Sequence, residues 1–250
     1  MTKSTYTFKG AIHLHTTYSH DGVLTLEELA RFLRDRGYDF MAVTEHSQDM
    51  TAESLVELET KSAALSDESF LIIPGIEFTC TATIHILGIG VTSLCESEDP
   101  SVVIDYIHAR GGLAVLAHPS NKDYPIEPSW VAKLDGCEIW NNRHGKWLPQ
   151  MEAIRKFHDL ARHAPGLKAF AGLDLHGPGG YSQVYMAVRT DALTQEAVAS
   201  AFQSGNYTMG AHFVSLPACG RPGALRSLYI ALFRTLLNGA RWVWHRFRGD

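Results

Sequence analysis

The stretch His13-Leu14-His15-Thr16-Thr17-Tyr18-Ser19-His20-Asp21-Gly22 carries most of the information about the fold of this chain. It begins at the end of a short apolar run that is typical of a β-strand. Successive side chains of a strand alternate between its two faces, so His13 and His15 point the same way and can converge on one cation. His20 and Asp21 follow in the next turn as further candidate ligands. The stretch therefore predicts the beginning of a metal site.

The same kind of chemistry recurs at or just after the ends of later apolar runs. These further candidates are His46 within Thr44-Glu45-His46, Glu77, His85, His118, Asp174 and His176. A (β/α) barrel carries its functional groups at the ends of its strands, so this order along the chain indicates one site built from many strands. We expect the remaining apolar-flanked histidines to be ordinary hydrogen-bonded side chains. They are His108, His158, His163, His212 and His245.

Length and composition limit the class of protein. A chain of 250 residues fits one large α/β domain. Its net charge of −5 leaves no global basic surface, so we expect no stable nucleic-acid complex and only local binding of any nucleic-acid substrate. The four cysteines are scattered without a CxxC pair, which argues against a disulfide scaffold or a thiolate metal site. No apolar run approaches the ~18 residues of a membrane span or resembles a secretory signal, so we expect a cytoplasmic location.

Strand-like and helix-like patterns alternate along most of the chain, which predicts a largely parallel sheet joined by crossover helices. Thr25 can cap a helix while Glu28 reaches back to complete a capping box, and Gly37 would end this helix. The other expected helices cover residues 53–65, 102–109 and 149–162. The expected strands cover residues 8–15, 40–44, 70–73, 84–89, 113–117, 137–140 and 169–173, with a late edge strand at 185–188.

The C-terminal stretch from about residue 224 combines an apolar face with several arginines, which predicts a basic amphipathic helix. Such a helix can pack on the preceding domain or on a second copy of the chain. Trp242 and Trp244 also favour an interfacial contact with a membrane surface. We expect a domain boundary near residue 215, with residues 1–215 forming the metal-binding domain and residues 216–250 this helix.

Taken in order, the motifs resemble those of the polymerase and histidinol phosphatase family, the PHP domain. The resemblance covers residues 11–176 and rests on His-x-His, Thr-Glu-His, Pro-Gly-Ile-Glu with a downstream histidine, Ala-His-Pro and Gly-Leu-Asp-Leu-His. Each motif is weak alone, and the ordered set is specific. The resemblance implies an α/β fold, namely a distorted (β/α)7 barrel with up to three metal ions at the C-terminal ends of its strands.

The resemblance also implies how the ligands are shared. One metal would be enclosed by His13, His15, Glu77 and Asp174, and a second, bridged by Glu77, by His85 and His118. His46 and His176 would hold a third metal together with either His20 or Asp21. Many members have Ser-Asp-Gly where this chain has Ser19-His20-Asp21-Gly22, so either side chain fits, and we favour His20 slightly. A second departure is Glu45, where aspartate is frequent, and either carboxylate could orient a ligand.

A site rich in imidazoles and carboxylates, without thiolates, suits divalent zinc, manganese or iron. Paired metals about 3.5–4 Å apart can acidify a bridging water and clamp the oxygens of an in-line displacement at phosphorus. We therefore expect hydrolysis of a phosphate ester, which could be a small phosphomonoester, a nucleotide or the end of a short oligonucleotide. Asp174, His176 and His20 are the candidate catalytic residues, with His176, or whichever of His20 and Asp21 is not a ligand, protonating the leaving oxygen.

Two basic residues are candidate substrate contacts. Lys122 follows the Ala-His-Pro motif and Arg143 follows Asn141, in loops expected on the same face as the metals. Arg143 can bind two phosphate oxygens at once, whereas Lys122 would act as a point charge. Two other functions stay open: a zinc amidohydrolase, which also begins with His-x-His, and a noncatalytic metal-stabilised binding module.

Overall fold

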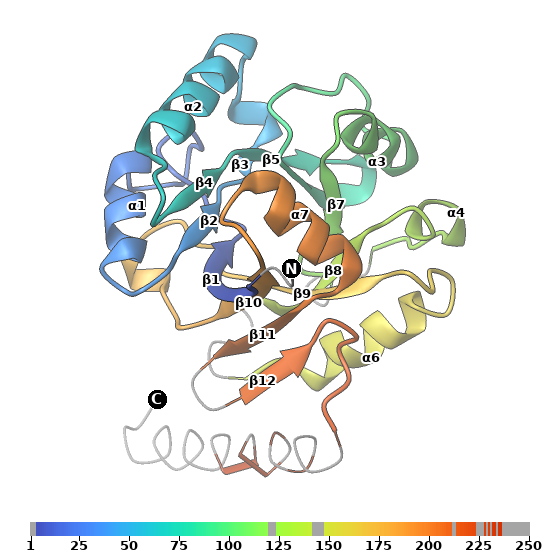
Figure 1. Ribbon diagram of the computed structural model, residues 1–250. Coiled ribbons are helices and arrows are strands. Elements are labelled where there is room, and N and C mark those ends of the chain that lie inside the picture. Colours follow the sequence, from blue (N-terminus) through green and yellow to red (C-terminus); the bar gives the residue numbers. More distant parts are fainter. Residues whose placement is uncertain are drawn as a thin grey trace, which may run out of the picture. The chain divides into compact units, whose positions relative to one another are not determined.

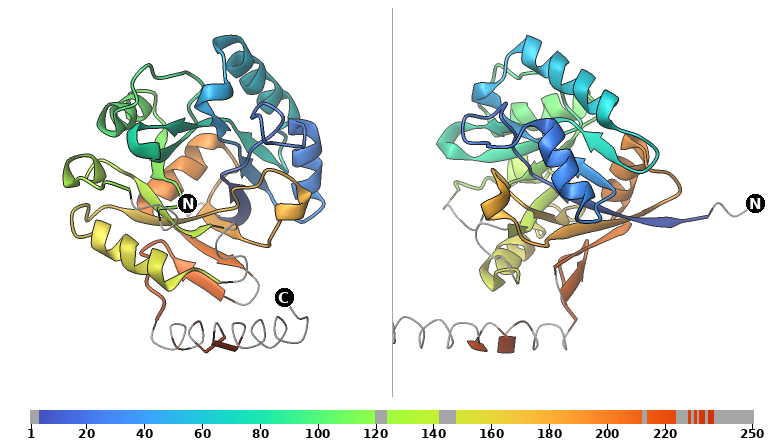
Figure 2. Two further views of the ribbon diagram at one scale, coloured as in Figure 1. Left: turned by 180° about the vertical axis from the view of Figure 1, so that it is seen from behind. Right: turned by 90° about the vertical axis from the view of Figure 1, so that its left-hand side faces the viewer.

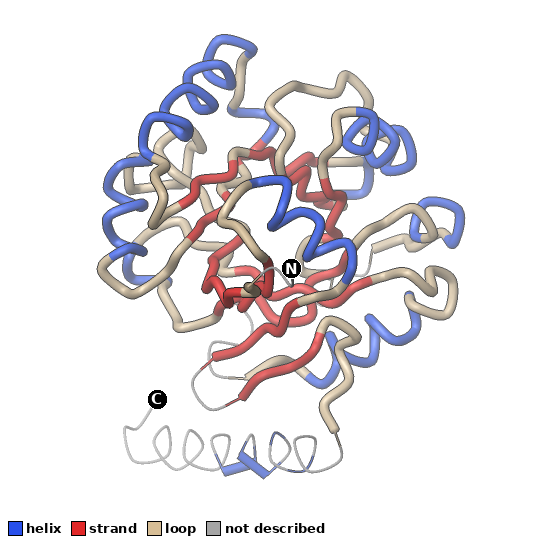
Figure 3. Tube along the Cα trace, in the orientation of Figure 1, coloured by secondary structure: helices blue, strands red, loops and turns tan. Residues whose placement is uncertain are grey.

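The computed structural model describes residues 4–119, 124–141, 148–211 and 214–223, together with residues 228, 230, 232, 233, 235 and 236. The chain divides into two compact units, residues 1–220 and 221–250. In the first unit the helices lie outside the strands when it is viewed from several sides (Figures 1 and 2). Figure 3 shows the strands of this unit gathered in its middle. The predicted mixture of α and β structure is confirmed, and it takes the form of two mixed sheets.

The first sheet contains both ends of the first unit. Its strand order is β12-β11-β10-β1-β2-β4. β1 runs parallel to β2, and β2 parallel to β4, whereas β10, β11 and β12 join on the other side in antiparallel pairs. The bounds of these strands are β1 Tyr6–Ile12, β2 Phe40–Ala42, β4 Leu71–Ile73, β10 Tyr185–Thr190, β11 Tyr207–Ala211 and β12 Val214–Pro217.

The second sheet has the strand order β3-β5-β6-β7-β8-β9. β6 is antiparallel to both of its neighbours, and the other pairs in this sheet are parallel. The bounds are β3 Glu45–His46, β5 Gly75–Thr79, β6 His85–Ile89, β7 Leu113–Leu116, β8 Gly136–Asn141 and β9 Lys168–Gly172.

All four expected helices are present, with their ends displaced by a few residues. The Thr25 side chain accepts a hydrogen bond from the Glu28 backbone and the Glu28 carboxylate accepts one from the Thr25 backbone, so the predicted capping box is confirmed. The helices are α1 Leu26–Arg34, α2 Ala52–Leu65, α3 Pro100–Ala109, α4 Pro128–Val131, α6 Met151–Leu160 and α7 Gln195–Ser204, and the short 3-10 turns are η1 Ser47–Asp49, η2 Thr81–Thr83 and η3 Pro178–Gly180.

Several expectations about the strands are wrong. The sheet is not largely parallel, because β5 and β6 form an antiparallel pair, and β5 itself was not expected. The strand at 185–188 is not at an edge, since β10 lies between β11 and β1, and the sequence pattern did not predict α7, β11 or β12. The first strand ends at Ile12 rather than at residue 15.

The two sheets meet through hydrogen bonds just beyond the ends of their strands. On one side the His15 backbone N–H donates to the Leu175 carbonyl over 3.0 Å, and Leu173 donates to Ile12 over 2.9 Å. On another, the Thr44 N–H donates to the Leu14 carbonyl over 2.8 Å. Ile12 and Leu14 are fully buried between these contacts. The residues that follow the strands are therefore brought together in one region.

Most of the predicted C-terminal helix, and with it both tryptophans, lies outside the described residues. Within the described part of that stretch, Leu228, Leu232 and Leu236 are exposed. Among the residues that the structure describes, no helix has the length and apolar content needed to cross a membrane.

Candidate metal centre

Eight of the predicted ligands lie in or just after strands and meet in one region, which Asp21 also reaches. His13 and His15 follow β1, His46 ends β3, and Glu77 lies in the middle of β5. The remaining four are His85 at the start of β6, His118 after β7, and Asp174 and His176 after β9. They come from both sheets, although they are spread over more than 160 residues of sequence.

Glu77 lies at the centre of this group. Its Oε1 is 2.8 Å from Nδ1 of His85 and 3.3 Å from Nε2 of His118. Its Oε2 is 2.9 Å from Nδ1 of His46 and 3.5 Å from Nε2 of His15. Each carboxylate oxygen thus faces a different set of imidazoles, which is the arrangement of a carboxylate able to bridge two cations.

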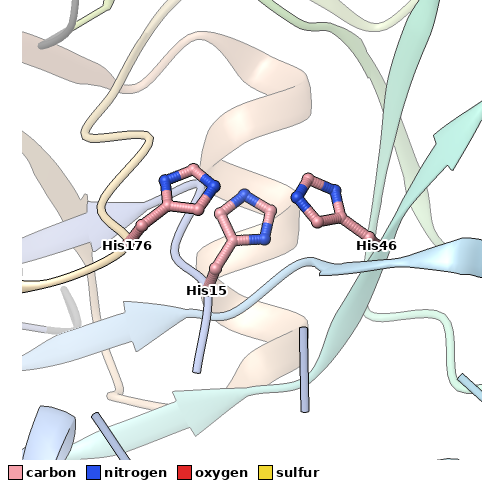
Figure 4. Close-up of side chains that lie close together, drawn as sticks. All are labelled: His15, His46 and His176. Carbon is pink, nitrogen blue, oxygen red and sulfur yellow. The ribbon is translucent and has the colours of Figure 1, made fainter. Parts of the chain in front are cut away.

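Three overlapping groups of side chains have ligand atoms close enough together to hold a cation. Asp174 Oδ1 lies 3.6 Å from His13 Nε2 and 3.9 Å from His15 Nε2. The ring of His15 lies between those of His46 and His176 (Figure 4), and its centroid is 4.2 Å from the centroid of each. The three groups are His13–His15–Asp174, His13–Glu77–His118 and His15–His46–His176.

The backbone at this centre differs from the simple strand that was expected. His13, His118 and Asp174 have φ values of 60°, 29° and 48°, in the left-handed region that non-glycine residues rarely adopt. Each of these conformations costs on the order of 1–3 kcal/mol and is held by the surrounding structure. His13 and His15 therefore converge because the chain turns sharply after β1, and not because they alternate along a continuous strand.

Buried hydrogen bonds fix the orientation of the two leading histidines. Nδ1 of His13 lies 2.8 Å from Oε1 of Glu138, which as a carboxylate can only accept, so Nδ1 carries the proton. Nδ1 of His15 lies 3.4 Å from the hydroxyl of Ser19, which itself donates to Oε2 of Glu45 over 2.6 Å. In both rings the other nitrogen, Nε2, is left with its lone pair towards the centre.

The surroundings of these two Nε2 atoms show whether a metal ion fits between the side chains of the centre. Nε2 of His13 and Nε2 of His15 are buried and have no hydrogen-bond partner among the described residues. Both face the oxygens of Glu77 and Asp174 at 3.4–3.9 Å. Lone pairs that face carboxylates across this distance repel each other unless a proton or a cation lies between them. The donor set of imidazoles and carboxylates therefore fits a divalent cation.

The histidines of the centre lower the pKa values of its carboxyl groups, which favours the ionised form that binds a cation. Burial raises the pKa of Glu77, but the surrounding histidines, His13 first, outweigh burial and hold its pKa well below the ordinary value. Burial likewise opposes ionisation of Asp174, yet His13 and His118 lower the pKa of this carboxyl. Both carboxylates are thus ionised at neutral pH and available to a cation.

The Glu45 carboxylate contacts the turn that follows β1. Its carboxylate accepts hydrogen bonds from the Thr16 backbone, the Thr16 hydroxyl and the Ser19 hydroxyl, and burial raises its pKa. Ser19 also accepts a hydrogen bond from the His46 backbone N–H. The carboxylate therefore orients His15 through Ser19, and no described hydrogen bond joins it to the imidazole of His46.

His20 and Asp21 separate in the structure. Asp21 reaches the centre, with Oδ1 at 3.3 Å from Nε2 of His46 and Oδ2 at 3.1 Å from Nε2 of His176. His20 instead pairs through Nδ1 with Oδ2 of Asp49 at 2.7 Å, and its side chain is 65% exposed at the rim. Its ring still lies only 5.7 Å from that of His46.

Sequence reasoning did not identify Glu138 as part of the centre. This carboxylate lies inside the buried strand β8, where it contacts His13 and the backbone N–H of His118. The available signal was a single charged residue within the apolar run Gly136-Cys137-Glu138-Ile139-Trp140. A buried charge without a function is rare, so such a position merits attention. The two predicted substrate contacts, Lys122 and Arg143, lie outside the described residues.

The sequence profile of the PHP domain matches residues 11–176, which is more than half of the chain. The chain belongs to the PHP domain family. The expected resemblance is therefore confirmed, and the ligand-bearing strand ends described above fall within the matched range. His/Asp/Glu groups able to hold metal thus occur in a family whose structural relatives include metal-dependent phosphoesterases.

The chain is also similar to individual known proteins. Over 77 residues it is 38% identical to the DNA polymerase/3'-5' exonuclease PolX of Bacillus subtilis, a match that covers 28% of this chain and 13% of PolX. A two-domain protein from Bacteroides vulgatus, described as containing a predicted PHP-like metal-dependent phosphoesterase, is 20% identical, with a TM-score of 0.62 over 84% of this chain and 66% of that one.

The lesion-specific endonuclease PfuEndoQ from Pyrococcus furiosus is 13% identical, with a TM-score of 0.55 over 82% of this chain and 58% of that one. At these identities the two solved structures show a shared fold. The chain spans only part of the length of each of these three proteins.

Proposed function

We propose that the protein is a metal-dependent phosphoesterase that hydrolyses a phosphate ester. The observation that carries this proposal is the convergence of histidine, aspartate and glutamate side chains around Glu77, which five imidazoles contact, with the buried Nε2 atoms of His13 and His15 lacking a described partner. A noncatalytic module would have no need to retain so complete a set. The family of the chain supports the same reading.

The proposed centre holds up to three divalent ions of zinc, manganese or iron. His13, His15 and Asp174 would hold one, and Glu77 would bridge it to a second held by His85 and His118. His46 and His176 would hold the third, and the short distances from Asp21 to both of them favour Asp21 over His20 as its completing ligand. When bound, such ions acidify a water molecule and neutralise charge on the phosphate.

The side chains of this protein supply the proton transfer. His20 lies at the rim of the centre with Nδ1 held by Asp49, so its Nε2 is free to face solvent or a bound substrate. We therefore assign His20 the role of protonating the leaving oxygen. His176 is the alternative proton donor. Asp174 faces His13 and His15, and its role is to position the metal ion that these three residues would hold.

The proposed substrate is a small phosphomonoester, a nucleotide or the end of a short oligonucleotide. PolX is named as a 3'-5' exonuclease and PfuEndoQ as an endonuclease, which supports phosphate esters of nucleotides as one class to test. The net charge of −5 favours a small ligand over a long polyanion. From their sequence positions, Arg143 and Lys122 are proposed to contact the phosphate.

We further propose that the two sheets together make the distorted barrel expected of this family. The hydrogen bonds from His15 to Leu175 and from Leu173 to Ile12 support this, because each joins the end of β1 in the first sheet to the residues after β9 in the second. Closure of this kind would place all the ligands at one end of the barrel, as in other barrel enzymes.

The test is hydrolysis by the purified full chain with Mn²⁺ or Zn²⁺, measured as release of inorganic phosphate, mononucleotides or free amino acid. The panel contains alkyl phosphates, mononucleotides and short 5'- and 3'-phosphorylated oligonucleotides, with an N-acyl amino acid to detect amidohydrolase activity. Release from one class, abolished by a chelator and restored by metal, would support the proposal. Hydrolysis of the amide alone, or silence with metal bound, would overturn it.

A further inference from the structure

Glu138 is a buried carboxylate for which the proposed reaction provides no direct role. It lies in β8, and its side chain is fully buried. Burying an ionised carboxylate in a protein interior costs free energy unless hydrogen bonds or paired charges satisfy its oxygens. The contacts of its two oxygens therefore indicate what it does.

The first oxygen controls His13. Oε1 lies 2.8 Å from Nδ1 of His13 and accepts its proton. With the proton fixed on Nδ1, the lone pair of the ring is on Nε2, which faces Glu77 and Asp174. A histidine that binds metal through one nitrogen commonly donates from the other to a carboxylate, which sets its tautomer and orientation and raises its basicity.

The second oxygen holds the other side of the centre. Oε2 accepts a hydrogen bond from the backbone N–H of His118 over 2.9 Å and one from Nδ2 of Asn141 over 3.1 Å. His118 is held at a φ of 29°, a conformation that needs such support. Asn141 also reaches Oδ2 of Asp174 at 3.4 Å. One carboxylate is thus connected to residues that follow β1, β7 and β9.

The neighbouring strand leaves room for this carboxylate. A Cβ atom at Gly172, at the end of β9, would lie 1.8 Å from Oε1 of Glu138 and 2.9 Å from Cβ of His13. Any other residue at position 172 would displace the carboxylate or the histidine. The position of Glu138 is therefore built into two strands and does not depend on the conformation of one side chain.

We propose that Glu138 is a positioning residue of the metal centre, which fixes the Nδ1–H tautomer of His13 and anchors the backbone of His118 so that both rings present their Nε2 atoms to a divalent cation. This rests on the proposed function only in that a metal ion occupies the centre. Glu138 itself touches neither metal nor substrate.

The test compares Zn²⁺ affinity of the full-length wild type with that of Glu138→Gln, by competition with a chromophoric chelator. An amide presents one acceptor and one donor, so it cannot accept from His13 on one side and from both His118 and Asn141 on the other. We expect Zn²⁺ affinity to fall about 10–100-fold, as for other residues that orient metal-bound histidines. Glu138→Asp, which keeps the charge but shortens the reach, is expected to lose less.

The matched control is Cys137→Ala, a buried change at the adjacent position of β8, which points to the opposite face of the strand. It is expected to leave Zn²⁺ affinity within about twofold of the wild type. A second readout is the NMR signal of the His13 Nδ1–H in the zinc form. The hydrogen bond to a carboxylate shifts this proton downfield, and the shift is expected to be lost in Glu138→Gln.

The outcomes separate this inference from the function on which it rests. Wild type that binds Zn²⁺ while Glu138→Gln binds it equally well, with the His13 signal unchanged, would overturn the inference and leave the proposed function standing. Wild type that binds no metal would overturn both. If neither Glu138 variant folds while Cys137→Ala does, Glu138 serves the fold itself and the inference is wrong.

Discussion

At the scale of single residues, His20 and Asp21 are neighbours in the chain, yet their side chains meet different partners. Asp21 lies between two imidazoles of the centre, whereas His20 is held by Asp49 at the rim. The sequence could not separate them, because both stand in one turn and both are ordinary ligand types. Only the direction in which the turn sends each side chain decides which of the two reaches the centre.

We expect Asp21→Asn to reduce the number of metal ions bound per chain, and His20→Ala to leave that number unchanged. His20→Ala should instead lower kcat by about 10²–10⁴-fold with a substrate whose leaving alcohol has a high pKa, since such an oxygen needs a proton. With p-nitrophenyl phosphate, whose leaving group needs no proton, the loss should be small.

Metal content by mass spectrometry and kcat on the two substrates provide these measurements. Loss of metal in His20→Ala with full retention in Asp21→Asn would reverse the two assignments.

In the metal-free protein the pKa values of His13 and His15 are shifted in opposite directions. Burial lowers the pKa of His13, but Glu138, Glu77 and Asp174 outweigh it and raise the pKa well above the ordinary value. Burial lowers the pKa of His15 well below its ordinary value, and Glu77 offsets this only in part. A proton on Nε2 of His13 therefore competes with a metal up to a higher pH than on an ordinary histidine, whereas His15 loses its second proton at a lower pH.

It follows that metal affinity should rise with pH, by up to about tenfold per pH unit while one proton is displaced. The gain should continue up to the raised pKa of His13 and then level off. Zn²⁺ dissociation constants measured between about pH 6 and pH 8 check this, since the ordinary histidine pKa of ~6.5 lies in that range. An affinity that does not change over this interval would contradict the assignment of His13 as a ligand.

The backbone conformation of the predicted ligand residues could not be predicted from the sequence. His13, His118 and Asp174 have positive φ values, a region in which sequence patterns lead one to look for glycine. The types and order of the ligands were predictable because metal chemistry selects them. Their conformations were not, because hydrogen bonds from distant residues such as Glu138 hold them.

At the scale of the elements, helices were predicted best because their signals are local. The capping box of α1 illustrates this, since Thr25 and Glu28 are three residues apart and satisfy each other. We expect Thr25→Ala to lower the free energy of unfolding by about 1 kcal/mol, through loss of one cap. Metal affinity should be unchanged.

Urea denaturation of Thr25→Ala beside Thr60→Ala measures this effect. Thr60 is an exposed residue inside α2 whose hydroxyl donates to the carbonyl of Val56 and caps nothing, so its replacement should change stability by less than about 0.5 kcal/mol. Equal effects of the two substitutions would show that the capping box contributes no stability.

The antiparallel pair β5–β6 was missed because its turn gives no recognisable signal. The turn of a tight hairpin usually contains Asn-Gly or Asp-Gly, because these residues tolerate positive φ. Here Ala82 and Thr83 adopt φ values of 56° instead. Pro74 also separates β4 from β5, two short strands that belong to different sheets, and the expected strand at 70–73 ends before it.

At the scale of the whole first unit, the metal centre lies where the two sheets meet. His13 and His15 follow a strand of the first sheet, whereas Glu77, His85 and His118 belong to strands of the second or follow them. Without a cation, the carboxylates of Glu77 and Asp174 repel each other across this junction. Metal binding should therefore stabilise the unit as a whole and not only its loops.

We expect Zn²⁺ or Mn²⁺ at about 100 times its dissociation constant to stabilise the folded state by about 2.7 kcal/mol. Thermal unfolding with and without chelator measures the effect, and His13→Ala should abolish most of it. A melting temperature that rises equally in His13→Ala would place the stabilising ion elsewhere in the molecule.

The metal dependence of hydrolysis is what we would measure first, because the proposed function is that these side chains form a metal centre that hydrolyses phosphate esters. Metal is removed from the full chain with a chelator, and Mn²⁺ or Zn²⁺ is titrated back while both bound metal and product release from the panel are measured. We expect no release without metal, and release that rises with occupancy and saturates at about two to three ions per chain. Full occupancy without release from any phosphate ester, or release that continues undiminished without metal, would contradict it.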